Sequence, residues 1–293
     1  MISSIWLALR PKTLTAAVVP IVVGTALAYV ETKSYSIHVV VLTLLASLFI
    51  QIATNLFNDA IDFKKGADTD QRIGPQRVTQ SGLLKIANVY LLAGFFLMAA
   101  VICGIPLVIR GGMPILGVGL VSLFLAYAYT GGPLPLAYKG LGDIFVVLFF
   151  GVIAIGGVYY LHTLQWHPSP FIAGLQIGFL ATVLLAINNL RDIEQDRLAN
   201  KKTLAVRFGI KWARYEIIFL LLAAFFLGSY WLFSGKPWAA ILPLVVVPLT
   251  RKIILGISSQ LPGPQFNVYL GQAALVHLVF GLQLSLGLIL ANF

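Results

Sequence analysis

The stretch of sequence that decides the fold runs from residue 34 to residue 58 and reads SYSIHVVVLTLLASLFIQIATNLFN. It contains no Asp, Glu, Lys or Arg, and a helix needs about 20 apolar residues to cross the hydrocarbon core of a bilayer. The stretch therefore predicts a transmembrane helix. A charged segment, DAIDFKKGADTDQR at 59–72, follows it directly. One end of this helix thus meets a polar region.

The composition extends this prediction to the whole chain. Of the 293 residues, 59% are hydrophobic and 10% are charged, whereas soluble domains carry about 25% charged residues. Together with a mean hydropathy of +0.93, these values exclude an ordinary soluble enzyme and a disordered chain. Long apolar runs also argue against a transmembrane barrel, whose strands alternate apolar and polar residues. We therefore predict an all-α, polytopic membrane protein.

Stretches without charged residues give the individual spans. We expect nine transmembrane helices in a single domain over residues 1–293, with the turn at 167–170, which reads HPSP, separating two of them. The N-terminal segment lacks the residue order of a signal peptide, and we expect it to be retained. The predicted helices cover about residues 13–30, 37–57, 87–109, 112–130, 143–162, 170–190, 214–233, 237–257 and 267–291.

Basic residues indicate the orientation of the chain. In the nine-helix topology, 17 of the 20 Lys and Arg residues fall on the face that also holds the N-terminus. Basic residues are enriched in cytoplasmic loops, so we expect a cytoplasmic N-terminus in a multi-pass protein of the plasma or inner membrane. The formal net charge of +10 then requires no nucleic-acid partner, and nothing in the sequence indicates an obligate protein partner.

The acidic residues gather in two segments. Seven of the ten Asp and Glu residues fall in 59–70 and 192–196, which follow the second and the sixth predicted helix. Because acidic residues contribute little to membrane topology, orientation does not explain this clustering. The equivalent positions of the two segments indicate a shared function at one face of the membrane.

Polar residues within each segment are spaced for one helical face. Residues four apart lie above one another on a helix, so Asn58 aligns with Asp62, and Asp192 with Asp196. An offset of 134 superposes the first pair on the second. An offset of 133 instead superposes another pair, Asn55 and Asp59, on Asn188 and Asp192. The segments form a weak internal repeat whose register these spacings leave open.

Several carboxylates at one membrane-proximal site repel one another unless cations lie between them. Oxygen ligands from Asp and Asn suit Mg²⁺, which often binds substrate phosphates as well. Two acidic segments can therefore hold a diphosphate through Mg²⁺, while neighbouring Lys and Arg side chains contact the remaining oxygens. The candidate bases are Lys64, Lys65, Arg72, Arg77, Arg197 and Lys201.

A diphosphate site at a membrane surface indicates an isoprenyl diphosphate, whose apolar tail lies in the bilayer between helices. The expected reaction is heterolysis of the allylic C–O bond, with Mg²⁺ as Lewis acid on the departing diphosphate and a nucleophile capturing the cation. Aromatic side chains help to hold such a cation, and the chain has 35 of them. For any one acidic residue taken alone, the alternative is a position in a solvated loop of mixed charge.

The two acidic segments resemble the Asp-rich motifs of the UbiA-type intramembrane prenyltransferase superfamily. That resemblance covers essentially the whole chain and implies nine helices around a central cavity. It also implies Mg²⁺-dependent transfer of a prenyl group from its diphosphate to an acceptor. The first motif departs from the family pattern at position 66, which is Gly. The matching residues are Asn58, Asp59 and Asp62 in the first motif, NDxxDxxxD, and Asp192 and Asp196 in the second, DxxxD.

Three longer runs are similar to the menaquinone-pathway members of the superfamily, the 1,4-dihydroxy-2-naphthoate polyprenyltransferases. They are DFKKGAD…RIGPQRVTQSG at 62–82, YTGGP…YKGLGD at 129–143 and NNLRD…DR…NKKTL…RFG at 188–209, and RPKTL at 10–14 also fits. This resemblance implies that polyprenyl diphosphate and dihydroxynaphthoate are the substrates. The acceptor would lose its carboxylate as the prenyl group enters, and the products would be CO₂, diphosphate and a demethylmenaquinol.

The resemblance also implies roles for individual residues at a site facing the cytoplasm. We expect catalytic roles for Asp62, which would orient or deprotonate the acceptor hydroxyl, and for Asp59, Lys139 and Tyr129. The expected diphosphate-binding residues are Lys12, Lys64, Arg72, Arg77, Lys139, Arg197 and Lys201. The expected Mg²⁺ ligands are Asn55, Asn58, Asp59, Asp62, Asp68, Asp192 and Asp196, with the role of Asp68 relative to Asp70 left open.

Three alternatives remain at this point. The acceptor could be another aromatic or lipid molecule, such as 4-hydroxybenzoate, although that branch is expected to keep an acid at position 66. A secondary transporter would also fit a weak internal repeat and acidic residues, but transporters place ionisable residues near the membrane midplane. Here the second and sixth helices are uncharged until their ends. A membrane module that only binds a ligand has no feature in its favour.

Overall fold

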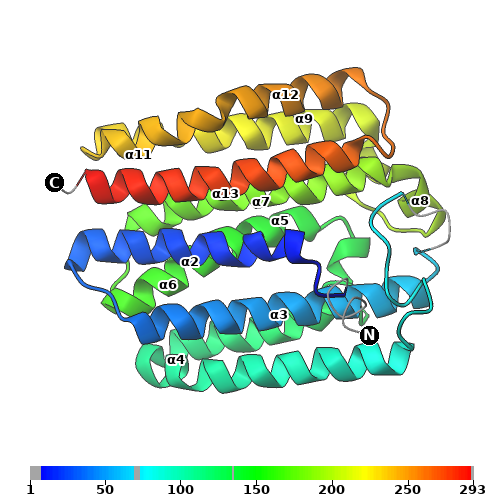
Figure 1. Cartoon of the computed structure of the whole chain (residues 1–293), viewed down its shortest axis with the longest axis horizontal. Helices are drawn as coiled ribbons and strands as arrows, with labels where there is room; N and C mark the ends of the chain where they lie inside the picture. The colour runs from blue at the N-terminus through cyan, green and yellow to red at the C-terminus, as the bar shows by residue number, and fades with distance from the viewer. Residues whose placement is uncertain (1–7, 69–72, 134, 292–293) are drawn as a thin grey trace.

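The computed structural model describes residues 8–68, 73–133 and 135–291, without the side chains of Pro11 and Lys12. All regular structure in these ranges is helical, which confirms the all-α prediction. The helices are α2 (Pro11–Thr32), α3 (Ile37–Lys64), α4 (Ile86–Ala128), η1 (Leu136–Tyr138), α5 (Gly142–Val147), η2 (Leu148–Val152), α6 (Ile153–Thr163), α7 (Pro168–Arg191), α8 (Ile193–Leu198), α9 (Leu204–Phe226), α10 (Ser229–Phe233), α11 (Pro237–Ile241), η3 (Leu242–Val246), α12 (Val247–Ser259) and α13 (Phe266–Leu290). Figure 1 shows the long helices lying roughly along one axis.

Eight helical stretches within the described residues are long and apolar enough to cross a membrane. The longest, α4, has 43 residues and at about 1.5 Å per residue is about twice the length needed for one crossing. Gly112 interrupts it with φ 66° and ψ −152°, a conformation that glycine adopts without strain. The chain therefore has a kink at the position where the sequence predicts the boundary between two spans.

Contacts at the two ends of α4 show that the chain reverses direction within it. Before α4, the backbone N–H groups of Val78 and Thr79 bind the Asp59 side chain. After α4, the Thr130 hydroxyl binds Asn58. Both ends of α4 thus lie beside the last turns of α3, as two antiparallel spans require. The total of nine spans, the central cavity and the cytoplasmic N-terminus stay predictions.

Local sequence signals explain where several helices begin. Ser36 and Thr203 accept hydrogen bonds from the N–H groups three residues ahead, at the starts of α3 and α9, which satisfies backbone donors at a helix N-terminus. Pro168 occupies the first turn of α7, where its missing N–H and fixed φ are tolerated. The predicted break between two spans at 167–170 is therefore present.

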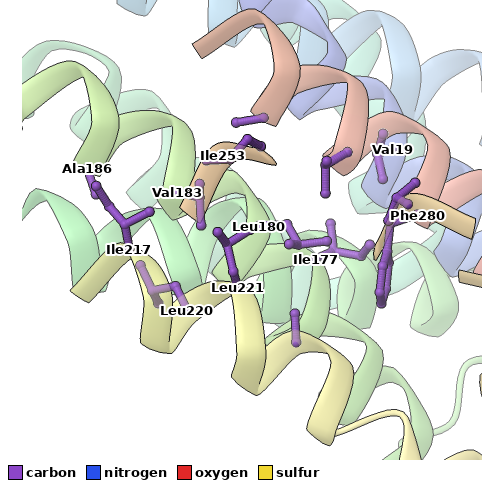
Figure 2. Packing of buried hydrophobic residues seen from close by; sticks show 14 of the residues in the cluster. Val19, Ile177, Leu180, Val183, Ala186, Ile217, Leu220, Leu221, Ile253 and Phe280 are labelled. Atoms are coloured by element: carbon purple, nitrogen blue, oxygen red, sulfur yellow. The ribbon is translucent and has the colours of Figure 1, made fainter. Parts of the chain in front are cut away.

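The main apolar core surrounds α7. Figure 2 shows Leu180 of α7 beside Leu221 of α9, and Ile177 of α7 extending toward Phe280 of α13, with Val19 of α2 close by. A second cluster lies between α3 and α4. The two acidic segments therefore end helices that belong to different clusters, so a site formed by both segments joins two packed parts of the molecule.

Glycines allow α7 to approach the preceding helical segment closely. A Cβ added at Gly174 would lie 2.6 Å from Cα of Val152, and one added at Gly151 would lie 2.1 Å from the Gly174 carbonyl oxygen. Small residues let transmembrane backbones meet in this way. The contact fixes α7 against η2.

Candidate active site

The ends of α3 and α7 that carry the acidic segments lie at the same end of the bundle. In Figure 1 this is the right-hand end, where α8 follows α7 and the loop after α3 begins. We call it the charged end. The sequence predicts that the two acidic segments meet at this end. The contacts of individual side chains describe how they lie there.

The polar residues of α3 face two directions. Asn55 donates through Nδ2 to the Thr13 hydroxyl at 3.0 Å, which ties α3 to the start of α2. Asp59 accepts N–H hydrogen bonds from Val78 at 3.2 Å and Thr79 at 3.1 Å. Asn55 and Asp59, four residues apart, thus hold the N-terminal region and the loop 73–82, which we call the anchored loop.

Asn58 and Asp62 point to the other side of α3. The Thr130 hydroxyl donates to Oδ1 of Asn58, and the Tyr138 hydroxyl donates to Oδ1 of Asp62 at 2.8 Å. Both partners come from the segment that links α4 to α5. Of the two predicted pairs in the first motif, only Asn58 and Asp62 face this segment, which leads toward the second motif.

Tyr138 lies between the two acidic segments. Its hydroxyl binds Asp62, and its carbonyl oxygen accepts the N–H of Lys202, beyond the second segment. The Lys65 ammonium lies 4.0 Å from the centroid of its ring, within the range of a cation–π contact. Burial and the Asp62 carboxylate raise the pKa of Tyr138 well above its ordinary value. The phenol therefore stays protonated and acts on Asp62 as a hydrogen-bond donor.

Lys65 is held from two sides. Its Nζ donates to the Thr130 carbonyl oxygen at 2.8 Å. Lys65 is exposed as a residue, but partial burial of its ammonium lowers its pKa. Asp62 opposes that change, and the positive charge of Lys201 adds to it. A lysine with a lowered pKa beside Asp62 and Tyr138 is ready to gain an anionic partner, because a nearby anion favours the charged form.

The second acidic segment has a half-buried lysine, Lys201. Nζ of Lys201 lies 3.4 Å from Oδ1 of Asp196, while Oδ2 of Asp196 is buried without a hydrogen-bond partner among the described residues. Burial raises the pKa of Asp196 to about 6, with Lys201 opposing and Asp192 adding to the increase. For Lys201, burial alone would lower the pKa, but Asp196, Asp62 and Asp192 outweigh it and raise the pKa. Lys201 thus responds to carboxylates from both motifs.

Asp192 is bound by its neighbour in the chain. Arg191 donates through Nε to Oδ1 of Asp192 at 2.7 Å and through Nη2 to Oδ2 at 2.6 Å. The Arg191 side chain is fully buried and also binds Asn188 and Asn267. Arg191 and Asn267 were not assigned from the sequence.

Other predicted residues lie apart from this group. Arg197 pairs with Glu194 at 2.8 Å on the exposed side of α8, and Lys64 and Lys139 are exposed. Asp68 pairs instead with Arg77 of the anchored loop, at 3.3 Å. Arg72, Asp70 and the side chain of Lys12 lie outside the described residues.

Tyr129 lies at the edge of the group. Its hydroxyl is against Gly142, where an added Cβ would be only 2.8 Å away. Burial raises the pKa of Tyr129, and the carboxylates of Asp143, Asp62 and Asp196 add to the increase. Its neighbour Thr130 and the nearby Tyr138 were within the quoted runs but had no assigned role. Their signal was a polar side chain in a Gly- and Pro-rich segment between two spans.

The donor set fits a hard divalent cation, although no ready-made cage exists. Within the described ranges, no three His, Cys, Asp or Glu side chains converge to hold a metal ion by themselves. Oxygen donors from Asn58, Asp62, Asp192 and Asp196 are available, and the unpartnered Oδ2 of Asp196 offers a buried negative atom. Mg²⁺ often binds through one or two carboxylates and completes its shell with water and substrate phosphates.

Comparison with known proteins gives consistent results. The sequence model described as the UbiA prenyltransferase family matches residues 17–259. The chain is 35% identical to "1,4-dihydroxy-2-naphthoate octaprenyltransferase" of Haemophilus influenzae, over 97% of this chain and 95% of that protein. It is 37% identical to the protein of the same name from Escherichia coli, over 84% and 82% of the two chains.

The fold is similar to that of a solved UbiA homolog from Archaeoglobus fulgidus bound to GPP and Mg²⁺. The TM-score is 0.67 at 19% sequence identity, and the match covers 98% of this chain and 99% of that chain. At this identity the likeness concerns the fold alone.

Proposed function

We propose that this chain, which belongs to the UbiA prenyltransferase family, transfers a polyprenyl group from its diphosphate to 1,4-dihydroxy-2-naphthoate with loss of CO₂ and diphosphate. The chain is a membrane-bound prenyltransferase with several membrane-spanning helices. This family membership removes the secondary transporter from consideration. The names of the relatives that align with nearly the whole chain support the naphthoate acceptor.

One observation carries the chemistry: carboxylates from both acidic segments gather around Lys201 and Tyr138. Nζ of Lys201 lies 3.4 Å from Oδ1 of Asp196 and 5.9 Å from the centroid of the Tyr138 ring, and the Tyr138 hydroxyl donates to Asp62. A site with acids and bases interleaved at the end of a helical bundle fits a metal-bound diphosphate headgroup whose apolar tail lies between helices.

We assign the metal to Asn58, Asp62, Asp192 and Asp196. When bound there, Mg²⁺ would supply a Lewis acid that stabilises the negative charge of the departing diphosphate. The other predicted ligands, Asn55, Asp59 and Asp68, are bound to the N-terminal region and the anchored loop. We therefore give those three residues a supporting role.

Lys201 and Lys65 are the bases best placed for the diphosphate oxygens. Both lie beside Tyr138, whereas Arg197 is turned toward Glu194. In the transfer, the allylic C–O bond breaks and its electron pair leaves with the diphosphate. The ring of the acceptor supplies electrons for the new C–C bond, and the electron pair of the C–CO₂ bond restores the ring as CO₂ departs.

Asp62 remains our candidate for orienting or deprotonating the acceptor hydroxyl. Tyr138 fixes one of its two oxygens, and among the described residues the second has no hydrogen-bond donor, so it can face a ligand. Tyr129 and Lys139, in the same linking segment, are proposed to line the approach. We also propose that the whole chain acts as one domain, in the plasma or inner membrane, with the charged end toward the cytoplasm.

An acceptor panel tests this proposal. Purified protein is incubated with Mg²⁺, a polyprenyl diphosphate and either dihydroxynaphthoate labelled in its carboxyl group or 4-hydroxybenzoate. We expect prenylated naphthoquinol and labelled CO₂ in equal amounts from the first acceptor and little product from the second. Prenylation of 4-hydroxybenzoate alone would contradict the naphthoate assignment. Prenylated naphthoate that keeps its carboxylate would contradict the decarboxylation.

A further inference from the structure

Arg191 is a buried cation to which the proposed reaction gives no role. Its side chain has no exposed surface, so it cannot touch a substrate from the position it occupies. A buried charge is costly unless it is paired and hydrogen-bonded. Here four hydrogen bonds from the guanidinium satisfy the charge. The question is what this arrangement does for the site.

The break between α7 and α8 allows the Arg191 guanidinium to bind the Asp192 carboxylate. Adjacent residues in a continuous helix do not face each other. Asp192 has φ −96° and ψ 14°, so α7 ends at Arg191 and α8 begins only at Ile193. The guanidinium fork then reaches both oxygens of the neighbouring carboxylate, at 2.7 and 2.6 Å. Each oxygen keeps a second lone pair for another cation.

Asn267 connects the same guanidinium to the anchored loop. Nη1 of Arg191 donates to Oδ1 of Asn267 at 2.7 Å. Nδ2 of Asn267, at the start of α13, donates to the Ile73 carbonyl oxygen at 3.2 Å and to that of Pro264 at 3.0 Å. All three contacts agree with one orientation of the amide. Asp192 is therefore connected to the loop through two side chains.

This loop is also the one that the first acidic segment holds. Asp59 accepts hydrogen bonds from the N–H groups of Val78 and Thr79, in the second half of the anchored loop. The loop is thus fixed at Ile73 from the second segment and at 78–79 from the first. A change in the Arg191 network would reach both halves of the site.

We propose that Arg191 and Asn267 are positioning residues that set the Asp192 carboxylate for a metal–diphosphate ligand and couple it to the anchored loop. The inference rests on the proposed function, because it takes Asp192 as a metal ligand. Lys cannot replace Arg here, since an ammonium is a point charge without the planar fork that holds both oxygens. Residues that orient a metal ligand typically change metal affinity by about 10- to 100-fold when they are removed.

Metal binding without turnover provides the test. Purified protein is titrated with Mn²⁺ in the presence of inorganic diphosphate, and free Mn²⁺ is followed by electron paramagnetic resonance. We expect Arg191→Lys to bind Mn²⁺ at least about 10-fold more weakly than the wild type. Asn267→Ala keeps the buried charge and its contacts to Asp192 but loses the bond from Arg191 and the two bonds to backbone oxygens. It should weaken binding by at least about threefold.

Arg214→Lys is the matched control. Arg214 is likewise held by a hydrogen bond, to the backbone oxygen of Gln260 at 2.7 Å, but it lies outside the site, and its variant should bind Mn²⁺ as the wild type does. Wild-type affinity in folded Arg191→Lys would overturn the inference. If that variant does not fold, wild-type affinity in Asn267→Ala overturns it instead.

A second readout separates positioning from general stability. If Arg191 and Asn267 position a metal ligand, raised Mg²⁺ should restore much of the prenyl-transfer rate of Asn267→Ala. An equal loss at every Mg²⁺ concentration would contradict the positioning role. A wild type that binds Mn²⁺ but does not prenylate naphthoate would contradict the proposed acceptor, while the Mn²⁺ titration still decides this inference. A wild type that binds no Mn²⁺ overturns both.

Discussion

The Tyr138 hydroxyl donates a 2.8 Å hydrogen bond to Oδ1 of Asp62, across 76 positions of the chain. This bond joins the end of α3 to the segment before α5. Because the tyrosine ring also contacts Lys65, one side chain orders an acid and a base of the proposed site at once.

Tyr138→Phe should lower kcat/KM for prenyl transfer by about 10- to 100-fold. The variant keeps the ring beneath Lys65 but removes the donor to Asp62, and a hydrogen bond to a charged group contributes about 1.5–3 kcal/mol. Steady-state kinetics on folded protein measure the effect. Tyr215→Phe is the control, because Tyr215 contacts Lys211 outside the site and its variant should keep wild-type activity. Equal activity in both variants would remove Tyr138 from the site.

Asp59→Asn should affect stability more than metal binding. The carboxylate accepts two backbone N–H bonds from the anchored loop, and its replacement by an amide should lower the free energy of unfolding by about 1–3 kcal/mol. Thermal unfolding in detergent measures this change, and Mn²⁺ titration should give an affinity within about twofold of the wild type. The reverse pattern, with metal affinity lost and stability kept, would return Asp59 to the ligand set.

Metal affinity should depend on pH through Asp196. Burial raises the pKa of Asp196 to about 6 in the protein without metal, and a proton on this carboxylate competes with a cation. Apparent Mn²⁺ affinity should therefore be constant above about pH 7 and fall as the pH drops through 6. Titrations between pH 5.5 and 7.5 measure the slope. Asp196→Asn should bind more weakly and flatten it; a slope unchanged in that variant would assign the proton to another group.

Gly174→Ala should destabilise the fold without involving the site. An added methyl group would lie 2.6 Å from Cα of Val152, and forcing an extra carbon into a packed contact costs about 1–3 kcal/mol. Gly156→Ala is the control, because no atom outside the neighbouring backbone of its own helix lies within 4 Å of the added Cβ among the described residues. Thermal unfolding of the two variants compares them, and equal midpoints would contradict the close contact between α7 and η2.

The apolar pattern was sufficient to predict the helical fold and the two charged helix ends. Most boundaries fall near the predicted ones, because uninterrupted apolar runs and prolines mark them. The different contacts of the polar residues within α3 were harder to predict. Asn55, Asn58, Asp59 and Asp62 fit the same chemistry by residue type, and only the position of the loop and of α2 shows that two of them face away from the second segment.

Two further features depend on local backbone breaks that residue type does not reveal. Arg191 reaches Asp192 because Asp192 leaves the helical conformation. Lys201 pairs with Asp196 because Asn200 adopts a left-handed conformation with φ 54° that turns the chain back. Arg197, which precedes this turn, pairs with Glu194 instead. Asn tolerates that conformation better than most residues, but its presence alone does not predict which basic side chain pairs with Asp196.

The most direct test of the central claim, that both acidic segments form one metal–diphosphate site, is prenyl transfer by single and paired variants. We expect Asp62→Ala, from the first segment, and Asp192→Ala with Asp196→Ala, from the second, each to abolish transfer and Mn²⁺ binding while the protein stays folded. Glu194→Gln, at an exposed position between the two aspartates, should keep both. Transfer that survives Asp192→Ala with Asp196→Ala would contradict the claim.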